Sequence, residues 1–144
     1  MWADTLLSAE RAHLARLTLW AMSSLLAGTA VLAVLRLRRL RSPLLSQFAI
    51  QLVAWGAISV AMAGMARGSL ALRDVTAARS LERFAWFNAG LEAGFVAVGA
   101  TLLVTGFLLG RRQGVMGAGA GVVVHGLGLL VLFLQFAALL SMLV

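Results

Sequence analysis

The chain has 144 residues, of which 62% are hydrophobic and 12% are charged, and it carries a formal net charge of +7 and no cysteine. Soluble domains are about half apolar and about a quarter charged, so this composition predicts an integral membrane protein. The missing cysteines exclude disulfides, thiolate metal sites and cysteine nucleophiles. The basic residues are all arginines at the ends of apolar runs, which suits lipid headgroups and orientation in a membrane rather than nucleic-acid binding.

Four apolar runs are long enough to cross a bilayer as helices, because lipid cannot hydrogen-bond a non-helical backbone. We therefore predict an all-α fold, a four-transmembrane-helix antiparallel bundle that forms a single integral membrane domain over residues 1–144. The helices are expected at approximately residues 14–35, 43–66, 84–110 and 114–142.

The segments that flank the first two helices carry local signals. Residues 1–12 are either a short interfacial lead-in or a frayed terminus. Ser42 followed by Pro43, the only proline, predicts an N-cap and a first-turn proline. Residues 67–83 are the one substantial connection, and they form either a short surface helix capped by Asp74 or a solvated linker.

The predicted helix 84–110 is the only membrane-length run that carries an acid, Glu92, with Asn88 one helical turn earlier. An ionised carboxylate at the bilayer centre costs about 2.5–3.5 kcal/mol on insertion scales, so such a group is usually paired or functional. Two positions for Glu92 are open. It lies near the headgroups, because residues 93–110 already form almost a full span, or it faces the bundle interior with Asn88.

Candidate partners for an interior Glu92 follow from depth in the membrane. Arg16 is the best-placed cation, because both residues lie a few turns from the surface that carries the termini. His13 and Gln135 lie at similar depth and are further candidates. The candidate intramembrane polar site therefore combines residues from several of the predicted helices.

His125 is the deepest polar residue of the fourth run, 13 residues beyond Arg112 and so about 20 Å along a helix. A neutral imidazole bonded to a neighbouring helix is one interpretation, with Gln51 as the expected partner. Haem ligation through His125 is the alternative. The only other histidine, His13, lies near the opposite surface, so a bis-His haem within the chain is not expected. No cofactor and no metal site are predicted.

Glycines recur at the small-xxx-small spacing that lets two helices approach closely. Gly90 and Gly94 form one such pair, and Gly117 and Gly121 form another. We interpret these four as helix-packing residues rather than as a cradle for a ligand. No phosphate loop and no Ser/His/Asp arrangement is evident, so no catalytic residue and no enzymatic activity are predicted.

The arginines also predict an orientation. Two short connections, residues 36–41 and 111–112, hold half of the arginines and no acid. Because short basic loops weigh most in the positive-inside rule, these turns are expected in the cytoplasm. We therefore expect a multi-pass protein of the bacterial inner (cytoplasmic) membrane with both termini on the periplasmic side.

Two segments carry a family resemblance. FNAGLEAGFVAVGATL (87–102) and GAGAGVVVHGLGLLVLF (117–133) resemble a family of small four-helix bacterial membrane proteins of unknown function. The resemblance rests on an Asn-x-Gly-x-acid-x-Gly-aromatic pattern, which Asn88, Gly90, Glu92, Gly94 and Phe95 match, and on a glycine-rich fourth helix. The chain departs from the pattern at Glu92, where aspartate is expected, and at His125, where glutamine is expected. The resemblance implies a fold and no activity.

Two hypotheses for the function follow. The first is a non-enzymatic accessory or structural subunit of a membrane complex, or a small self-associating bundle, with lipids and other membrane subunits or itself as partners. The second is a binder or carrier of a small lipophilic or protonatable ligand, such as a quinone, a lipid, haem or a proton-coupled solute, through Glu92 and His125. A common cavity for these two side chains favours the second hypothesis.

Overall fold

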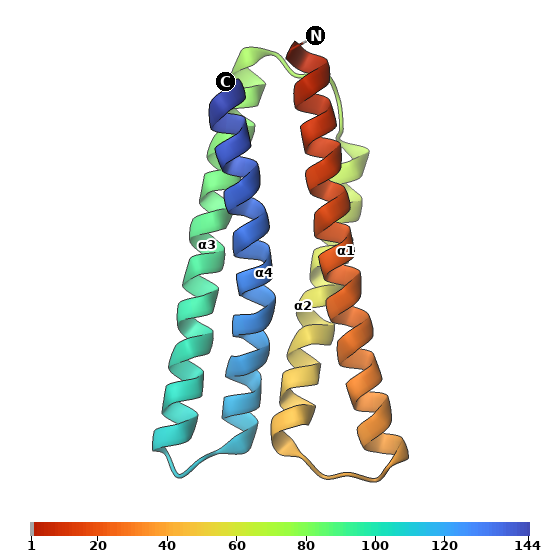
Figure 1. The fold of residues 1–144 in the computed structure, drawn as a ribbon, viewed down its shortest axis with the longest axis vertical. Coiled ribbons are helices and arrows are strands. Elements are labelled where there is room, and N and C mark those ends of the chain that lie inside the picture. The colour runs from red at the N-terminus through yellow and green to blue at the C-terminus, as the bar shows by residue number, and fades with distance from the viewer. Residues whose placement is uncertain (1) are drawn as a thin grey trace.

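A computed structural model describes residues 2–144, which form four long helices (Figure 1). Each of the four is long and apolar enough to cross a membrane. The predicted all-α, four-helix architecture is therefore confirmed. The helices are α1 (Trp2–Leu37), α2 (Pro43–Gly68), α3 (Val75–Leu108) and α4 (Gln113–Leu143).

Two helices are longer than the sequence predicted. Residues 2–12 belong to α1, so they are neither a separate lead-in nor a frayed terminus. Asp74 caps α3 by accepting a hydrogen bond from the Ala77 amide at 2.7 Å. The surface helix expected after Asp74 therefore continues without a break into the predicted third span, and the connection between α2 and α3 shortens to residues 69–74. The helix α4 also runs unbroken through Gly126 and Gly128.

The helices form two antiparallel hairpins, α1–α2 and α3–α4, whose tight turns lie at the same end of the molecule (Figure 1). The helix α4 is central, since it packs against α3, α2 and α1. By contrast, α3 packs against α4 and makes little contact with α1 or α2. This uneven packing leaves room between α3 and the first hairpin.

Glycines allow the close approach of α4 to its neighbours. A Cβ atom added at Gly121 would lie 2.8 Å from the Phe48 carbonyl oxygen of α2, and one added at Gly117 would overlap the Leu44 carbonyl of the same helix. Between α3 and α4, a Cβ atom at Gly119 would lie 2.6 Å from the Gly99 carbonyl oxygen. The structure thus places Gly117 and Gly121 at a helix contact, as the sequence predicted.

Gly90 and Gly94 behave differently. A Cβ atom added at either position would meet no atom within 4 Å in the described part of the chain. They therefore pack no helix of the described chain, and their predicted role in helix packing stays a prediction that concerns another chain. Their spacing is right for packing, but this face of α3 points away from α4, and spacing along a sequence does not fix the direction of a face.

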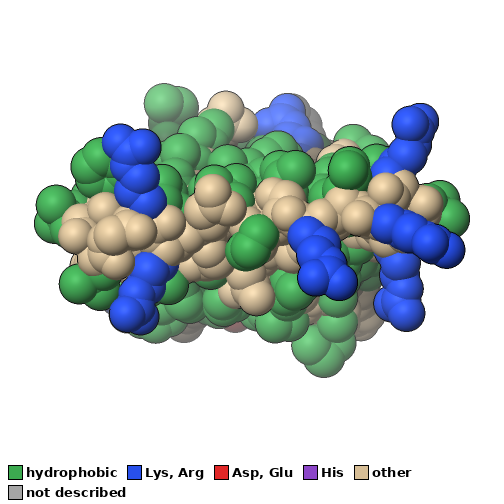
Figure 2. All heavy atoms as spheres, turned by 90° about the horizontal axis from the view of Figure 1, so that it is seen from below, with side chains coloured by type: hydrophobic (Ala, Val, Ile, Leu, Met, Phe, Trp, Pro, Cys, Tyr) green, Lys and Arg blue, Asp and Glu red, His purple; other side chains and the backbone are tan. Residues whose placement is uncertain are grey.

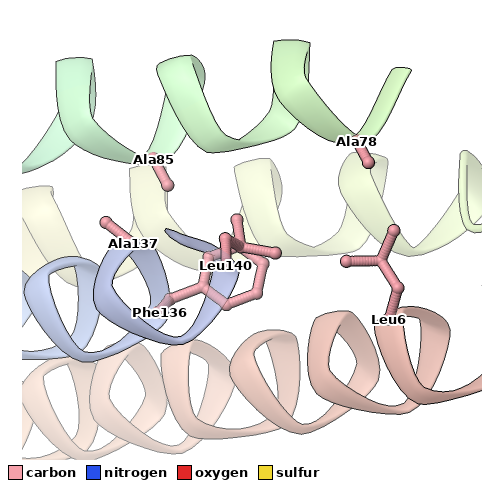
Figure 3. Packing of buried hydrophobic residues seen from close by; sticks show 6 residues of the cluster. All are labelled: Leu6, Ala78, Ala85, Phe136, Ala137 and Leu140. Carbon is pink, nitrogen blue, oxygen red and sulfur yellow. The ribbon is translucent and has the colours of Figure 1, made fainter. Parts of the chain in front are cut away.

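The end of the bundle that carries the termini has its own small core. Buried residues of α1, α3 and α4 meet there (Figure 3), namely Leu6, Ala78, Ala85, Phe136, Ala137 and Leu140. The indole of Trp2 donates a hydrogen bond to the Leu143 carbonyl at 2.7 Å and so ties the start of α1 to the end of α4. These contacts hold α1 and α3 on either side of α4 at this end.

The opposite end is basic. Figure 2 views the molecule from the side of the two turns and shows arginine side chains spread around that end, with no acidic side chain in sight. The second turn closes through Gly110, whose φ of 80° favours glycine. The sequence places six arginines here, Arg36, Arg38, Arg39, Arg41, Arg111 and Arg112.

Candidate ligand cavity

A cavity of about 410 Å³ lies between the four helices, in the half of the bundle nearer the termini. It fills the space that α3 leaves by not packing against α1 and α2. Its walls are mainly apolar and include five aromatic side chains from α2, α3 and α4, namely Trp55, Phe84, Phe95, Phe133 and Phe136. A few polar side chains among such walls are typical of sites for small molecules.

The cavity opens sideways between α2 and α3. From α2, Met62 and Met65 line it and are largely exposed, and from α3, Phe84 and Leu91 do the same. Nearer the basic turns, the rings of Trp55 and Phe95 meet with centroids 5.0 Å apart and bridge α2 to α3. On the side of the basic turns, the opening therefore ends at this aromatic contact. The side chains around the opening belong to the apolar outer surface of the bundle.

Glu92 and Asn88 form the polar part of the α3 wall. Both residues are buried, with 9% and 8% exposure. The Asn88 amide donates a hydrogen bond to the Phe84 carbonyl at 2.8 Å, which fixes the side chain against its own helix. Glu92 makes no hydrogen bond or ion pair with any residue of 2–144. Its Oε2 atom lies beside α4, 3.7 Å from where a Cβ atom on Gly126 would be.

His125 occupies the facing wall on α4 and is 2% exposed. Its Nδ1 lies 3.1 Å from the Ser24 hydroxyl of α1, and its Nε2 lies 3.2 Å from the Ser59 hydroxyl of α2. A neutral imidazole has one donor and one acceptor nitrogen, so two serine hydroxyls satisfy both. Haem ligation through His125 would require one of these contacts to break.

His13 lies further towards the termini. Its ring stacks on Phe136 with centroids 4.0 Å apart, and it meets Phe133 edge-on at 5.1 Å. Its Nε2 atom is buried and has no hydrogen-bond partner within residues 2–144. His13 therefore adds a polar atom with unused hydrogen-bonding capacity to a wall that is otherwise aromatic.

An ion pair lies at the terminus end of the cavity. The Arg73 guanidinium, in the connection between α2 and α3, donates two hydrogen bonds to the Glu10 carboxylate, at 2.6 Å to Oε1 and 3.0 Å to Oε2. These hydrogen bonds raise the pKa of Arg73, while its partial burial acts in the opposite direction. Because Glu10 also lines the cavity, the pair fixes the α2–α3 connection against α1 next to this end of the site.

The structure brings together only part of the predicted polar site. Asn88, Glu92 and His125 line the cavity, and so does His13. The other three predicted members lie elsewhere, and the cavity walls do not include them: Arg16, Gln51 and Gln135.

The expected partnerships of these three residues are wrong for separate reasons. Arg16 is exposed on the outer face of α1 and makes no ion pair with Glu92. Gln135 is exposed on α4. Gln51 packs against the Gly121 position, one turn below His125, and its side-chain oxygen accepts a hydrogen bond from the Trp55 indole at 3.0 Å. In each case the depth is similar to that of the expected partner, but the side chain points elsewhere.

Four residues of the site were not singled out from the sequence. Ser24 and Ser59 are hydroxyls inside apolar runs, which is a usable signal, since a polar group in such a run needs a partner. Glu10 and Arg73 lie in segments assigned to a lead-in and a loop. Their pairing depends on the α2–α3 connection reaching the first turns of α1, and no sequence spacing encodes that contact.

Fold and site together define a four-helix bundle with membrane-length helices and a cavity that opens through its side. The chain belongs to a family of unknown function (DUF6992), whose model matches residues 16–133. The matched region includes Arg73, Glu92 and His125, whereas Glu10 and His13 precede it. No curated protein and no solved structure shows a significant match to the chain.

Proposed function

We propose that this protein is a non-enzymatic integral membrane protein that binds a small amphiphilic molecule in the cavity between its helices. The observation that carries the proposal is that Glu92 and His125 line one aromatic cavity, which opens sideways between α2 and α3. In a bilayer, that opening faces the boundary between the hydrocarbon core and the headgroups. An amphiphilic molecule would enter the cavity from this layer of the membrane.

The position of the cavity supports an amphiphile rather than a purely apolar ligand. A hydrocarbon core of about 30 Å corresponds to about 20 helical residues. Counted back from the turn after Leu108, that length of α3 ends near Gly90, so Glu92 lies less than one helical turn inside the boundary. The ion pair of Glu10 and Arg73 then lies outside the hydrocarbon. A bound molecule would keep its polar group near this boundary and its apolar part among the aromatic rings.

Filling the cavity should remove the bound molecule. Ala63 is buried in the α2 wall, and Met62 stands at the opening. We expect Ala63→Phe and Met62→Trp to abolish co-purification of a small lipophilic molecule that native mass spectrometry detects on the wild-type protein. Because Met62 is exposed, its replacement tests the opening with little risk to folding. Ala57→Phe, on the exposed face of α2, is the matched control and should retain the molecule.

Two results of this experiment would contradict the proposal. One is a wild-type protein that carries no small molecule after gentle extraction and takes up none from added lipid extract. The other is a molecule retained equally by the wild type and both cavity variants. Either result would show that the cavity is not the binding site.

An accessory or self-associating bundle is the second candidate function. The observation in its favour is the open face of α3 at Gly90 and Gly94, where another helix could approach closely. The same mass spectra test it. A mass equal to two chains, or a co-purifying membrane subunit that Gly90→Val removes, would support an assembly through this face.

We also infer that the protein lies in the bacterial inner membrane with its arginine-rich turns in the cytoplasm and its termini in the periplasm. The six arginines around the turn end support this orientation (Figure 2). Because the chain has no cysteine, single cysteines can report topology. In intact cells, a membrane-impermeant maleimide should label Ser69→Cys and spare Gln113→Cys. The reverse pattern would invert the orientation.

A further inference from the structure

We propose that the ligand of the cavity is a lipophilic cation, for example an amine with an apolar body, and that the Glu92 carboxylate is its counter-ion. This inference rests on the proposed function, because it names the class of molecule that the same cavity takes.

Glu92 differs from the other acidic residues of the chain. Glu10 is paired with Arg73, Asp74 caps α3, and Glu82 accepts a hydrogen bond from Ser141. Asp4 also has an interaction partner. Of the five acids, Glu92 alone has no partner within residues 2–144. Its side chain is nevertheless buried, with 9% exposure. A buried carboxyl group in a protein is either protonated or paired, and a cation that enters the cavity would supply the partner that lets Glu92 carry its charge.

The walls around Glu92 also suit a cation. Five aromatic rings line the cavity, and the faces of such rings attract organic cations, most strongly where water is excluded. Enclosures of aromatic rings are a recurrent arrangement for binding quaternary ammonium groups. A neutral molecule would gain contact area from the same rings but nothing from the carboxylate.

No positively charged side chain of the described residues is available to neutralise Glu92 in the cavity. From α1, Glu10 lines the wall and neutralises Arg73 through two hydrogen bonds. Arg16 is exposed on the outer face of the same helix. From α4, both nitrogens of His125 are engaged by serines. No arginine lines the cavity within residues 2–144. An anionic ligand would therefore face Glu92 with no compensating positive charge.

The test uses three probes with the same 4-phenylbutyl chain, which ends in a trimethylammonium, a hydroxyl or a sulfonate group. Binding is measured by equilibrium dialysis against the full-length protein in nanodiscs of neutral lipid, with empty nanodiscs subtracted. We expect the ammonium probe to bind the wild type at least about tenfold tighter than the alcohol, and the sulfonate to bind weakest. This comparison needs no variant and so does not depend on how any variant folds.

Variants then assign the preference to Glu92. In Glu92→Gln, we expect the ammonium probe to lose its advantage while the alcohol binds as before. Glu82→Gln removes an acid of the same helix outside the cavity and should keep the preference. A tenfold preference that survives in Glu92→Gln would overturn the role of Glu92.

The outcomes separate this inference from the proposed function. If the ammonium and alcohol probes bind the wild type equally, and Ala63→Phe abolishes both, the cavity binds amphiphiles and the cation inference is wrong. If Ala63→Phe and Met62→Trp change the binding of no probe, the proposed function itself is wrong.

Discussion

Replacing Gly117 with valine is expected to destabilise the bundle by about 3 kcal/mol, the upper part of the range for overpacked interiors. A side chain at this position would overlap the Leu44 carbonyl, at the start of α2. The atoms in the way are backbone atoms of a helix whose first turn is fixed by the Ser42 cap and by Pro43, so they cannot move aside as a flexible side chain would. The contact between α2 and α4 must therefore separate, and the two hairpins lose their main connection.

The measurement is the midpoint of unfolding in a detergent titration, followed by far-UV circular dichroism. Gly90→Val is the matched control, because it places the same β-branched residue in a long apolar helix where nothing lies within 4 Å. We expect the control to change stability by less than about 0.5 kcal/mol. Equal effects of the two substitutions would mean that helix propensity, and not the contact with Leu44, decides the result.

Replacing Arg73 with methionine is expected to destabilise the protein by about 2–3 kcal/mol. The change leaves the Glu10 carboxylate, whose side chain is 8% exposed, without its partner, and an uncompensated buried charge is costly. The expected loss lies below the range of about 3–5 kcal/mol for broken buried pairs, because the Arg73 side chain is 24% exposed and therefore partly screened by water.

The double variant Glu10→Met with Arg73→Met should recover most of the lost stability, because it removes the unpaired charge. Arg79→Met is the control, since Arg79 is exposed on α3. Thermal unfolding of the four proteins in one detergent measures the effect. An Arg73→Met protein as stable as the wild type would show that the ion pair does not stabilise the contact of the α2–α3 connection with α1.

The number and order of the helices could be predicted from the sequence because membrane solvation leaves little choice of structure. A long apolar run must be helical, and local signals mark the ends. Ser42 and Asp74 both act as N-caps in the structure. The predicted starts of the first and third spans were late because hydropathy marks where a helix enters lipid, while α1 and α3 continue beyond that point as packed helices.

For the candidate site, the sequence predicted how deep each polar residue lies in the membrane but not which way its side chain points. Residue counts placed His125 deep in the membrane and Glu92 with Asn88 nearer the surface that carries the termini, and they left open whether the side chains share a cavity. The structure brings all three to one cavity. The direction of each side chain around its helix axis depends on which helices touch, and the sequence does not state this. That is why Gln51 was expected to bond His125, whereas Ser24 and Ser59 do so.

The direction of helix faces, which sequence spacing does not fix, also explains why the two glycine pairs differ. Gly117 and Gly121 share the spacing of Gly90 and Gly94, yet only the first pair faces another helix of the chain. The central position of α4 makes the difference, because α4 has neighbours on several sides and α3 has one main neighbour. Helix arrangement, which a single sequence does not reveal, therefore decides which of two equal motifs is buried.

Photo-crosslinking would show whether an amphiphile occupies the cavity through its side opening. A 4-phenylbutyl alcohol and a 4-phenylbutyl trimethylammonium, each with a diazirine on the ring, would be irradiated with the protein in nanodiscs, and the adducts mapped by mass spectrometry. We expect adducts on the cavity-facing residues of α2 and α3, around 58–65 and 84–95, and we expect these adducts to disappear in Ala63→Phe. Adducts spread over the outer apolar surface, unchanged in that variant, would contradict binding in the cavity.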